Sequence, residues 1–138
     1  GAMGGQNTQT CFTGDTLVTM ADGSSMAIKD IFVGDVVMSR DVIKGRNIKT
    51  VVTKTFEHPA SDGGRLLLIN GYLKVTPEHL LYNGRMWQPA SEFTTDDVLI
   101  NLDGSHMRVV SVREIVKNEP VYNIHVDNDV HNYFAGGG

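Results

Sequence analysis

Short apolar stretches separated by turn residues recur along most of this chain, and this pattern limits the fold more than any other feature. The stretches are rich in β-branched residues, which favour strands, and they cover residues 16–20, 36–39, 51–56, 66–69, 73–76, 98–102, 108–116 and 121–126. Turn pairs with glycine separate them, such as Asn70-Gly71, where both residues tolerate the positive φ of a tight hairpin. The only helix-like pieces, residues 27–32 and 89–93, are too short to be stable alone. The sequence therefore predicts an all-β fold.

The chain also contains a weak internal repeat. Residues 28–31 align with residues 90–93, and at the same offset residues 35–37 align with residues 97–99. A helical turn and then a strand follow in the same order in both copies, which predicts two related halves around a pseudo-two-fold axis. Chance agreement between short apolar patterns is the alternative explanation.

Length and composition favour a single soluble domain. The chain has 138 residues, of which 41% are hydrophobic, which is enough for one real core. The formal net charge is -4 with only 12 Lys and Arg, so no basic stripe is available to bind nucleic acid. No apolar run approaches the roughly 20 residues that cross a bilayer. We expect a monomer that binds neither nucleic acid nor membrane, and the compartment stays open.

The first ten residues differ in character from the rest. Gly1-Ala2-Met3-Gly4 is typical of the remnant of a cleaved expression tag, and residues 5–10 are polar without periodicity. We expect residues 1–10 to be a tag remnant and flanking segment outside the fold, and residues 11–138 to form the domain. Residues 104–107 resemble a cloning seam, although a natural turn explains Asp103-Gly104 equally well.

Cys11 is the only cysteine in the chain, which excludes an internal disulfide and a multi-cysteine zinc site. It is either a buried inert thiol or a reactive nucleophile. His58, His106 and His125 lack the spacing of metal ligands. We therefore expect no metal and no cofactor.

Four segments carry a resemblance to a known family. They are residues 11–18 (CFTGDTLV), residues 75–80 with a Thr-x-x-His motif, residues 121–126 (VYNIHV) and residues 131–134 (HNYF). In this order and spacing they resemble the conserved blocks of Hint domains, the family of inteins, bacterial intein-like domains and hedgehog autoprocessing domains. The resemblance spans nearly all of residues 11–134. It implies a flattened, horseshoe-shaped fold in which the strand of Cys11 runs through the centre and meets the Thr-x-x-His block.

The resemblance also implies a reaction, an N-to-S acyl shift in which Cys11 attacks its peptide bond to Thr10 and forms a thioester. An amide is more stable than a thioester and its nitrogen is a poor leaving group, so the site needs an acid. His79 is the candidate to protonate the Cys11 nitrogen. Thr76 is the candidate to direct its hydroxyl at the Thr10 carbonyl or to orient the imidazole. The alternative is that Thr76 merely ends a strand and His79 lies on the surface.

Two further candidates come from the third and fourth segments. His131 stands where relatives carry a histidine, which gives it a possible role in proton transfer. Asn123 stands where relatives carry an aspartate. Because an asparagine cannot ionise, Asn123 can form hydrogen bonds near the thiol but cannot act as a base.

The implied substrate is the chain's own flanking segments, or exteins, in a single-turnover reaction. We interpret His131-Asn132 as an internal block, and we expect the last strand and the terminal His-Asn pair that cyclises to lie beyond Gly138, in a longer parent chain. Two alternatives stay open: a hedgehog-type autoprocessing domain, and a catalytically inactive Hint fold used for binding or structure. Residues 90–121 are too few to hold a homing endonuclease.

Overall fold

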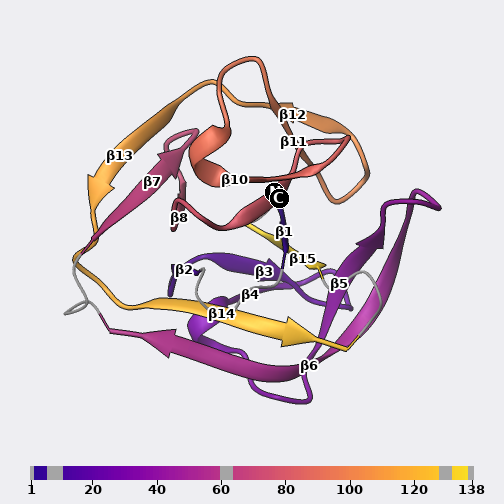
Figure 1. Cartoon of the computed structure of the whole chain (residues 1–138). Coiled ribbons are helices and arrows are strands. Elements are labelled where there is room, and N and C mark those ends of the chain that lie inside the picture. Colours follow the sequence, from indigo (N-terminus) through magenta and orange to yellow (C-terminus); the bar gives the residue numbers. More distant parts are fainter. Residues whose placement is uncertain (1, 6–10, 60–63, 128–131, 137–138) are drawn as a thin grey trace.

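The computed structural model describes residues 2–5, 11–59, 64–127 and 132–136. These residues form an all-β fold, as predicted (Figure 1). The strands are β1 (Ala2–Gly5), β2 (Phe12–Thr13), β3 (Leu17–Thr19), β4 (Ser25–Ala27), β5 (Val36–Asp41), β6 (Arg46–His58), β7 (Arg65–Ile69), β8 (Leu73–Val75), β9 (Leu80–Tyr82), β10 (Trp87–Pro89), β11 (Val98–Ile100), β12 (His106–Arg108), β13 (Val112–Val116), β14 (Val121–Val126) and β15 (Asn132–Ala135). Single helical turns, η1 (Ile28–Asp30) and η3 (Ala90–Glu92), interrupt them.

The strands form two large sheets and one small one. The first sheet has the order β13-β7-β8-β2-β14-β6-β5, the second has the order β10-β9-β1-β15-β3-β4, and β11 pairs with β12. In Figure 1, β7 with β13 and β6 with β14 form the two arms of a horseshoe, and β1, β2 and β15 lie between them. The short strand β2 therefore lies in the middle of the molecule, next to β8 on one side and β14 on the other.

The internal repeat corresponds to a repeated backbone arrangement. The first amide of η1, from Ile28, donates to the Thr16 carbonyl oxygen at 2.8 Å, and the first amide of η3, from Ala90, donates to the His79 carbonyl oxygen at the same distance. An aspartate then closes the next turn in each half, where Asp35 accepts from the Phe32 amide and Asp97 accepts from the Thr94 amide. The two halves predicted from the sequence thus share local geometry.

The predicted turn at Asn70-Gly71 is present between β7 and β8. The φ angles of Asn70 and Gly71 are 54° and 75°, and Asn70 is the only residue other than glycine with a positive φ among those described. Asn70 also accepts hydrogen bonds from the amides of Val110 and Ser111, so its side chain links this turn to the start of β13. The turn residues of the sequence correctly located this hairpin.

The expectation that residues 1–10 stay outside the fold is wrong for Ala2–Gly5. These residues form β1, which pairs with β15 along its whole length, from Ala2 opposite Ala135 to Gly5 opposite Asn132. On its other edge β1 pairs with β9 through Gly4 and Leu81. Ladder hydrogen bonds come from backbone groups, which every residue but proline supplies, so a strand can insert here without any side-chain periodicity.

The core lies between the sheets and surrounds β2. Phe12, Val75, Ile124 and Tyr133 are fully buried members of the largest apolar cluster. A smaller cluster joins β1 to the β11–β12 unit and to β15, and its buried members are Met3, Ile100 and Phe134. Phe12, the residue that follows Cys11, is therefore completely buried in the main core.

Candidate active site

Cys11 directly precedes β2 and is completely buried. Its side chain belongs to a small apolar cluster with Leu66 and Val121. Burial raises the pKa of the Cys11 thiol from 9.0 to about 12, and the positive charge of Lys117 partly opposes this shift. The thiol is therefore protonated at neutral pH and needs help from its surroundings to act as a nucleophile.

Thr76 lies immediately after β8 and holds the peptide unit of Cys11. The Cys11 amide nitrogen donates to Thr76 Oγ1 at 2.8 Å. In return, the Thr76 amide donates to the Cys11 carbonyl oxygen at 2.9 Å, and the Thr76 hydroxyl lies 3.3 Å from the same oxygen. The pairing of Phe12 with Val75 brings these two residues together. We expected the hydroxyl to face Thr10, which lies outside the described residues, whereas the described contact is with the Cys11 nitrogen.

His79 follows Thr76 after a turn that its own amide closes by donating to the Thr76 carbonyl oxygen at 3.1 Å. Its side chain is fully buried, so the alternative that it lies on the surface is wrong. The imidazole packs against the ring of Phe12 with the ring centres 4.4 Å apart. It also lies under β1, because a Cβ atom placed on Gly4 would be 3.3 Å from His79 Nε2. His79 is thus placed next to the residue that follows Cys11.

Asn123, in the middle of β14, is also fully buried. Its Oδ1 accepts a hydrogen bond from the Tyr133 hydroxyl at 2.5 Å and another from the Ile124 amide at 2.9 Å. The Asn123 side chain therefore works as an acceptor at this point, which agrees with its inability to ionise.

Tyr133 is a site residue that the sequence reasoning missed. Burial raises the pKa of its phenol well above the ordinary value, and the nearby Cys11 acts in the same direction. Its ring meets that of Phe12 edge-on, with the centres 6.1 Å apart. The signal in the sequence was a tyrosine inside the apolar run of residues 133–135, because a buried phenol must find a hydrogen-bond partner.

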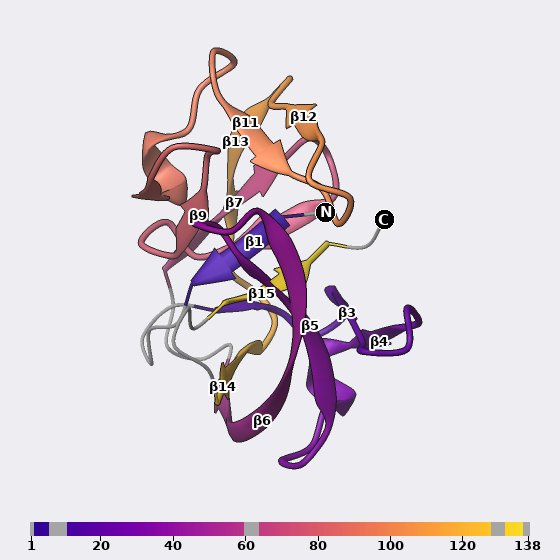
Figure 2. The same ribbon diagram turned by 90° about the vertical axis from the view of Figure 1, so that its right-hand side faces the viewer.

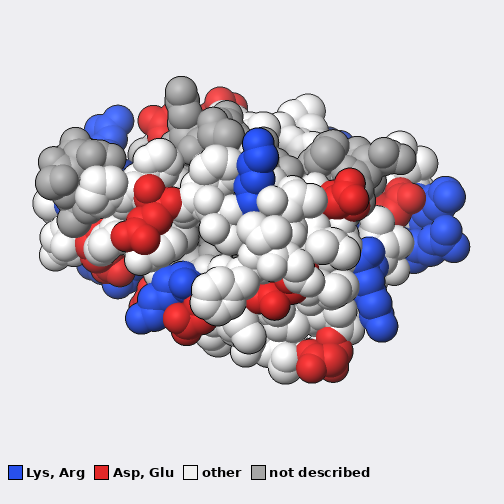
Figure 3. Space-filling view, turned by 90° about the horizontal axis from the view of Figure 1, so that it is seen from below, with Lys and Arg blue, Asp and Glu red and all other residues white. Residues whose placement is uncertain are grey.

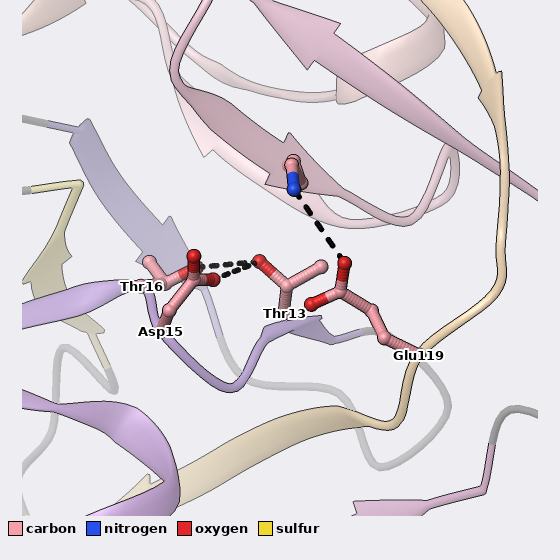
Figure 4. A network of polar contacts seen from close by, with 5 residues as sticks. Thr13, Asp15, Thr16 and Glu119 are labelled. Atoms are coloured by element: carbon pink, nitrogen blue, oxygen red, sulfur yellow. Dashed lines mark hydrogen bonds and ion pairs between the residues drawn. The ribbon is translucent and has the colours of Figure 1, made fainter.

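Two sets of polar contacts lie at the end of β2 and at β8 beside it (Figure 4). The Thr13 hydroxyl donates to Asp15 Oδ1 at 2.8 Å and lies 3.3 Å from the Thr16 hydroxyl. On the other side, Lys74 of β8 forms an ion pair with Glu119, with Nζ and Oε2 3.5 Å apart. The first set links β2 to the turn that follows it, and the second links β8 to the segment before β14.

Asn132 has a structural role. Its Oδ1 accepts hydrogen bonds from the Ser39 hydroxyl at 2.9 Å and the Arg40 amide at 3.0 Å, and its Nδ2 donates to the Arg40 carbonyl oxygen at 3.0 Å. The side chain therefore joins β15 to β5 and is fully buried. His131, the neighbouring candidate, lies outside the described residues.

A cavity of about 320 Å³ opens beside Thr76, lined by Gly64, Arg65, Thr76, Pro77, Glu78 and Lys117. Thr76 therefore lies at this cavity and also contacts the Cys11 amide. Within the described ranges, no three His, Cys, Asp or Glu side chains gather in a way that could hold a metal ion. No helix in the same ranges has the length and apolar character to span a membrane. Figure 3 shows Lys and Arg interspersed with Asp and Glu on one face of the molecule.

Comparisons with known proteins agree on one group. A family model described as "Pretoxin HINT domain" matches residues 17–138. The solution structure of a bacterial intein-like domain from Clostridium thermocellum superposes with a TM-score of 0.79 at 25% identity, covering 91% of this chain and 92% of that chain. A DnaB intein from Synechocystis sp. gives a TM-score of 0.80 at 20% identity, covering 92% and 94%. The TvoVMA intein gives 0.72 at 18% identity, covering 94% of each chain. No curated protein matches the chain.

Proposed function

Since the chain belongs to the pretoxin Hint domain family, we propose that it is a self-processing element whose Cys11 attacks the peptide bond that joins it to Thr10. The horseshoe-shaped Hint fold expected from four sequence segments is confirmed by this match and by the intein structures. The proposal concerns the chemistry, for which the contacts of Cys11 are the support. Its substrate is the polypeptide that flanks the domain, and each molecule reacts once.

The proposed step is an acyl transfer from nitrogen to sulfur. The Cys11 sulfur forms a bond to the Thr10 carbonyl carbon, and the bond between that carbon and the Cys11 nitrogen breaks. The proton lost by the thiol is balanced by the proton gained by the nitrogen, which leaves as an amine. Covalent attachment already places the sulfur near the carbonyl, so proximity supplies part of the barrier reduction.

The single observation that carries the proposal is the hydrogen bond from the Cys11 amide nitrogen to Thr76 Oγ1 at 2.8 Å. This contact fixes the position of the nitrogen that must leave. The same hydroxyl can turn and donate as the nitrogen becomes an amine. Groups positioned in this way around a reacting bond contribute a few kcal/mol where water is excluded.

His79 is the proposed proton donor to the leaving nitrogen. Its buried imidazole packs on Phe12, the neighbour of Cys11 in the chain, and it belongs to the same turn as Thr76. Proton transfer from a positioned histidine accelerates reactions by about 10²- to 10⁴-fold. His131 stays a predicted proton-transfer residue, and Asn123 is proposed to orient the surroundings of the thiol through its bond to Tyr133.

Asn132 is not the cyclising asparagine in this proposal. Cyclisation requires the side-chain nitrogen to attack the residue's own carbonyl carbon, but Asn132 Nδ2 donates to the Arg40 carbonyl oxygen. Breaking the three hydrogen bonds of this buried side chain would cost about 3 kcal/mol before any reaction began. Cyclisation is therefore assigned to a terminal His-Asn pair in a longer parent chain.

One alternative has an observation in its favour. A catalytically inactive Hint fold is supported by the burial of Cys11, which raises the pKa of its thiol to about 12, and by the non-ionisable Asn123. Hedgehog-type processing has no comparable support among the described residues.

Incubation with hydroxylamine separates the two functions. A thioester at Cys11 would react to release residues 1–10 as a hydroxamate, whose mass is diagnostic. The variant Cys11→Ala should release nothing, while Cys11→Ser, which can form only an ester, should be slower and should resist dithiothreitol. Equal release from wild type and Cys11→Ala would contradict the acyl shift, and no release from either protein would favour the inactive module.

A further inference from the structure

The start of β7 and the end of β13 cover the side chain of Cys11. The two strands lie together in the upper part of Figure 2, and their register sets Leu66 opposite Ile115. Leu66 belongs to the apolar cluster of Cys11, and Ile115 packs against that cluster. The ladder continues just past both strands, because the Lys117 amide donates to the Gly64 carbonyl oxygen at 3.3 Å. Lys117 is thus held by the same pair of strands that covers the thiol.

Lys117 lies on the same side of its segment as Ile115. Both residues are half-buried, whereas Val116 between them is 76% exposed. In an extended chain, residues two positions apart point to the same side. Because Ile115 points toward the Cys11 cluster, Lys117 also points inward rather than to the outer face of β13.

The cavity of about 320 Å³ connects Lys117 with the residue that holds the Cys11 peptide. Lys117 and Thr76 both line this cavity. Thr76 Oγ1 in turn accepts the hydrogen bond from the Cys11 amide nitrogen at 2.8 Å. The lysine therefore shares a cavity with one direct neighbour of Cys11 and a strand with another, Ile115.

The charge of Lys117 acts on Cys11. Burial raises the pKa of the thiol, and the positive charge of Lys117 lowers it. A nearby positive charge favours the thiolate, the reactive form of a cysteine. The phenol of Tyr133 stays neutral at pH 7 because burial raises its pKa, and Asn123 cannot ionise. Negative charge on the sulfur is therefore opposed by burial and supported by Lys117.

Other charged side chains of this region lie in ion pairs or are exposed. Arg65 Nη1 lies 3.3 Å from Glu114 Oε2, and Lys74 Nζ lies 3.5 Å from Glu119 Oε2. The two opposite charges of each pair largely cancel at a distance. Glu78 also lines the cavity but is exposed, so water screens its charge.

We propose that Lys117 is a positioning residue for the acyl shift, which holds a positive charge near Cys11 and favours negative charge on the sulfur as it attacks the Thr10 carbonyl carbon. This inference rests on the proposed function, because it names the residue that helps a buried thiol to react. The bonds that form and break are those of the acyl shift itself. Lys117 gives and takes no proton, and it acts only through its charge.

Alkylation of Cys11 tests this charge without requiring the acyl shift. Iodoacetamide is neutral and reacts with the thiolate, so its rate constant below pH 9 follows the thiolate fraction. In Lys117→Gln the rate constant should fall by about three- to tenfold, because the pKa of the thiol rises further. Lys117→Arg keeps the charge and should react like wild type. Lys44→Gln, in the hairpin between β5 and β6, is the matched control for loss of one exposed charge and should also react like wild type.

A loosened fold would accelerate alkylation, so a merely structural role of Lys117 changes the rate in the opposite direction. A rate in Lys117→Gln equal to or above that of wild type would overturn the proposal. The wild type gives a second measurement that needs no variant. Raising the ionic strength should slow its alkylation, since salt screens the charge, and a rate that does not depend on salt would also overturn the proposal.

Release of residues 1–10 by hydroxylamine then separates this inference from the proposed function. If Cys11 forms the thioester, Lys117→Gln should slow release by the same factor as alkylation, and Lys117→Arg should restore it. Slower alkylation with an unchanged release rate would overturn the role of Lys117 in the reaction. Slower alkylation of Lys117→Gln together with no release from wild type would contradict the acyl shift but support the action of the charge on the sulfur.

Discussion

Thr76 Oγ1 lies 2.8 Å from the amide nitrogen of Cys11, although the two residues are 65 positions apart in the chain. The pairing of β2 with β8 produces this contact, and the return bond from the Thr76 amide to the Cys11 carbonyl oxygen completes it. A half-buried hydroxyl thus touches the one nitrogen whose bond the proposed reaction breaks.

Thr76→Val tests this contact, because it keeps the shape of the side chain and removes the hydroxyl. Release of residues 1–10 by hydroxylamine should slow by about 10²-fold, because the hydroxyl that is proposed to turn and donate to the departing amine is lost. The free energy of unfolding should fall by about 1 to 2 kcal/mol, since the Cys11 amide loses its acceptor. Thr76→Ser, which keeps the hydroxyl, should stay close to wild type. Release from Thr76→Val at the wild-type rate would show that the contact is only structural.

Tyr133→Phe tests the support of Asn123. The variant loses the hydrogen bond to Asn123 Oδ1, while the bond from the Ile124 amide remains, so stability should fall by about 1 to 2 kcal/mol. If Asn123 orients the thiol, the variant should also raise the activation free energy of release by about 1 kcal/mol, which slows release by roughly fivefold. Tyr82→Phe, on β9, is the control and should change neither quantity. Denaturant unfolding and the release assay measure the two effects, and an unchanged release rate would exclude the positioning role.

The raised pKa of Cys11 predicts a distinct pH dependence. Burial shifts this pKa from 9.0 to about 12, so the folded state disfavours the thiolate. The contribution of this pKa difference to the free energy of unfolding is complete below pH 9, where the unfolded thiol is also protonated. It is lost as the pH rises from 9 toward 12. Wild type should therefore lose stability over this interval relative to Cys11→Ala. Alkylation by iodoacetamide should keep accelerating above pH 9 in the folded protein and level off in urea. Levelling near pH 9 in both states would contradict the shift.

Asn132 should remain uncleaved. Its side-chain nitrogen is bound to the Arg40 carbonyl oxygen, so prolonged incubation should leave the mass of residues 133–138 attached. Asn132→Ala should lower the free energy of unfolding by about 2 to 3 kcal/mol, because the Arg40 backbone loses buried partners. Mass spectrometry that finds residues 133–138 lost and a C-terminal succinimide on Asn132 would show that this asparagine does cyclise.

Much of the fold was predictable because its turns contain asparagine and glycine, which tolerate a positive φ angle. Asn70-Gly71 located the hairpin between β7 and β8, and the repeat located η1 and η3. The length of β6 was underestimated, since Arg46–His58 begins with polar residues that do not alternate clearly with apolar ones. Strand β1 was missed altogether because its pairing depends on backbone groups and on the neighbouring strands β9 and β15, which a local pattern does not encode.

The candidate site was predictable in part for similar reasons. Cys11, Thr76, His79 and Asn123 were singled out from the sequence, and the pairing of β2 with β8 and β14 gathers the strands that carry them. The partners were not predictable. The hydroxyl of Tyr133 reaches Asn123 only because β15 packs beside β2, and the shift in the Cys11 pKa arises from neighbours such as Leu66 and Val121 that are distant in the sequence.

The position of β1 has a consequence for the solubility of a processed molecule. If the bond at Cys11 is cleaved and β1 departs, β9 and β15 change from interior strands into bare edges. Proteins usually protect such edges with charged side chains or proline, but Leu80–Tyr82 and Asn132–Ala135 contain neither. The product would then offer two uncharged strand edges for pairing with another copy, so loss of β1 should increase self-association as the protein concentration rises.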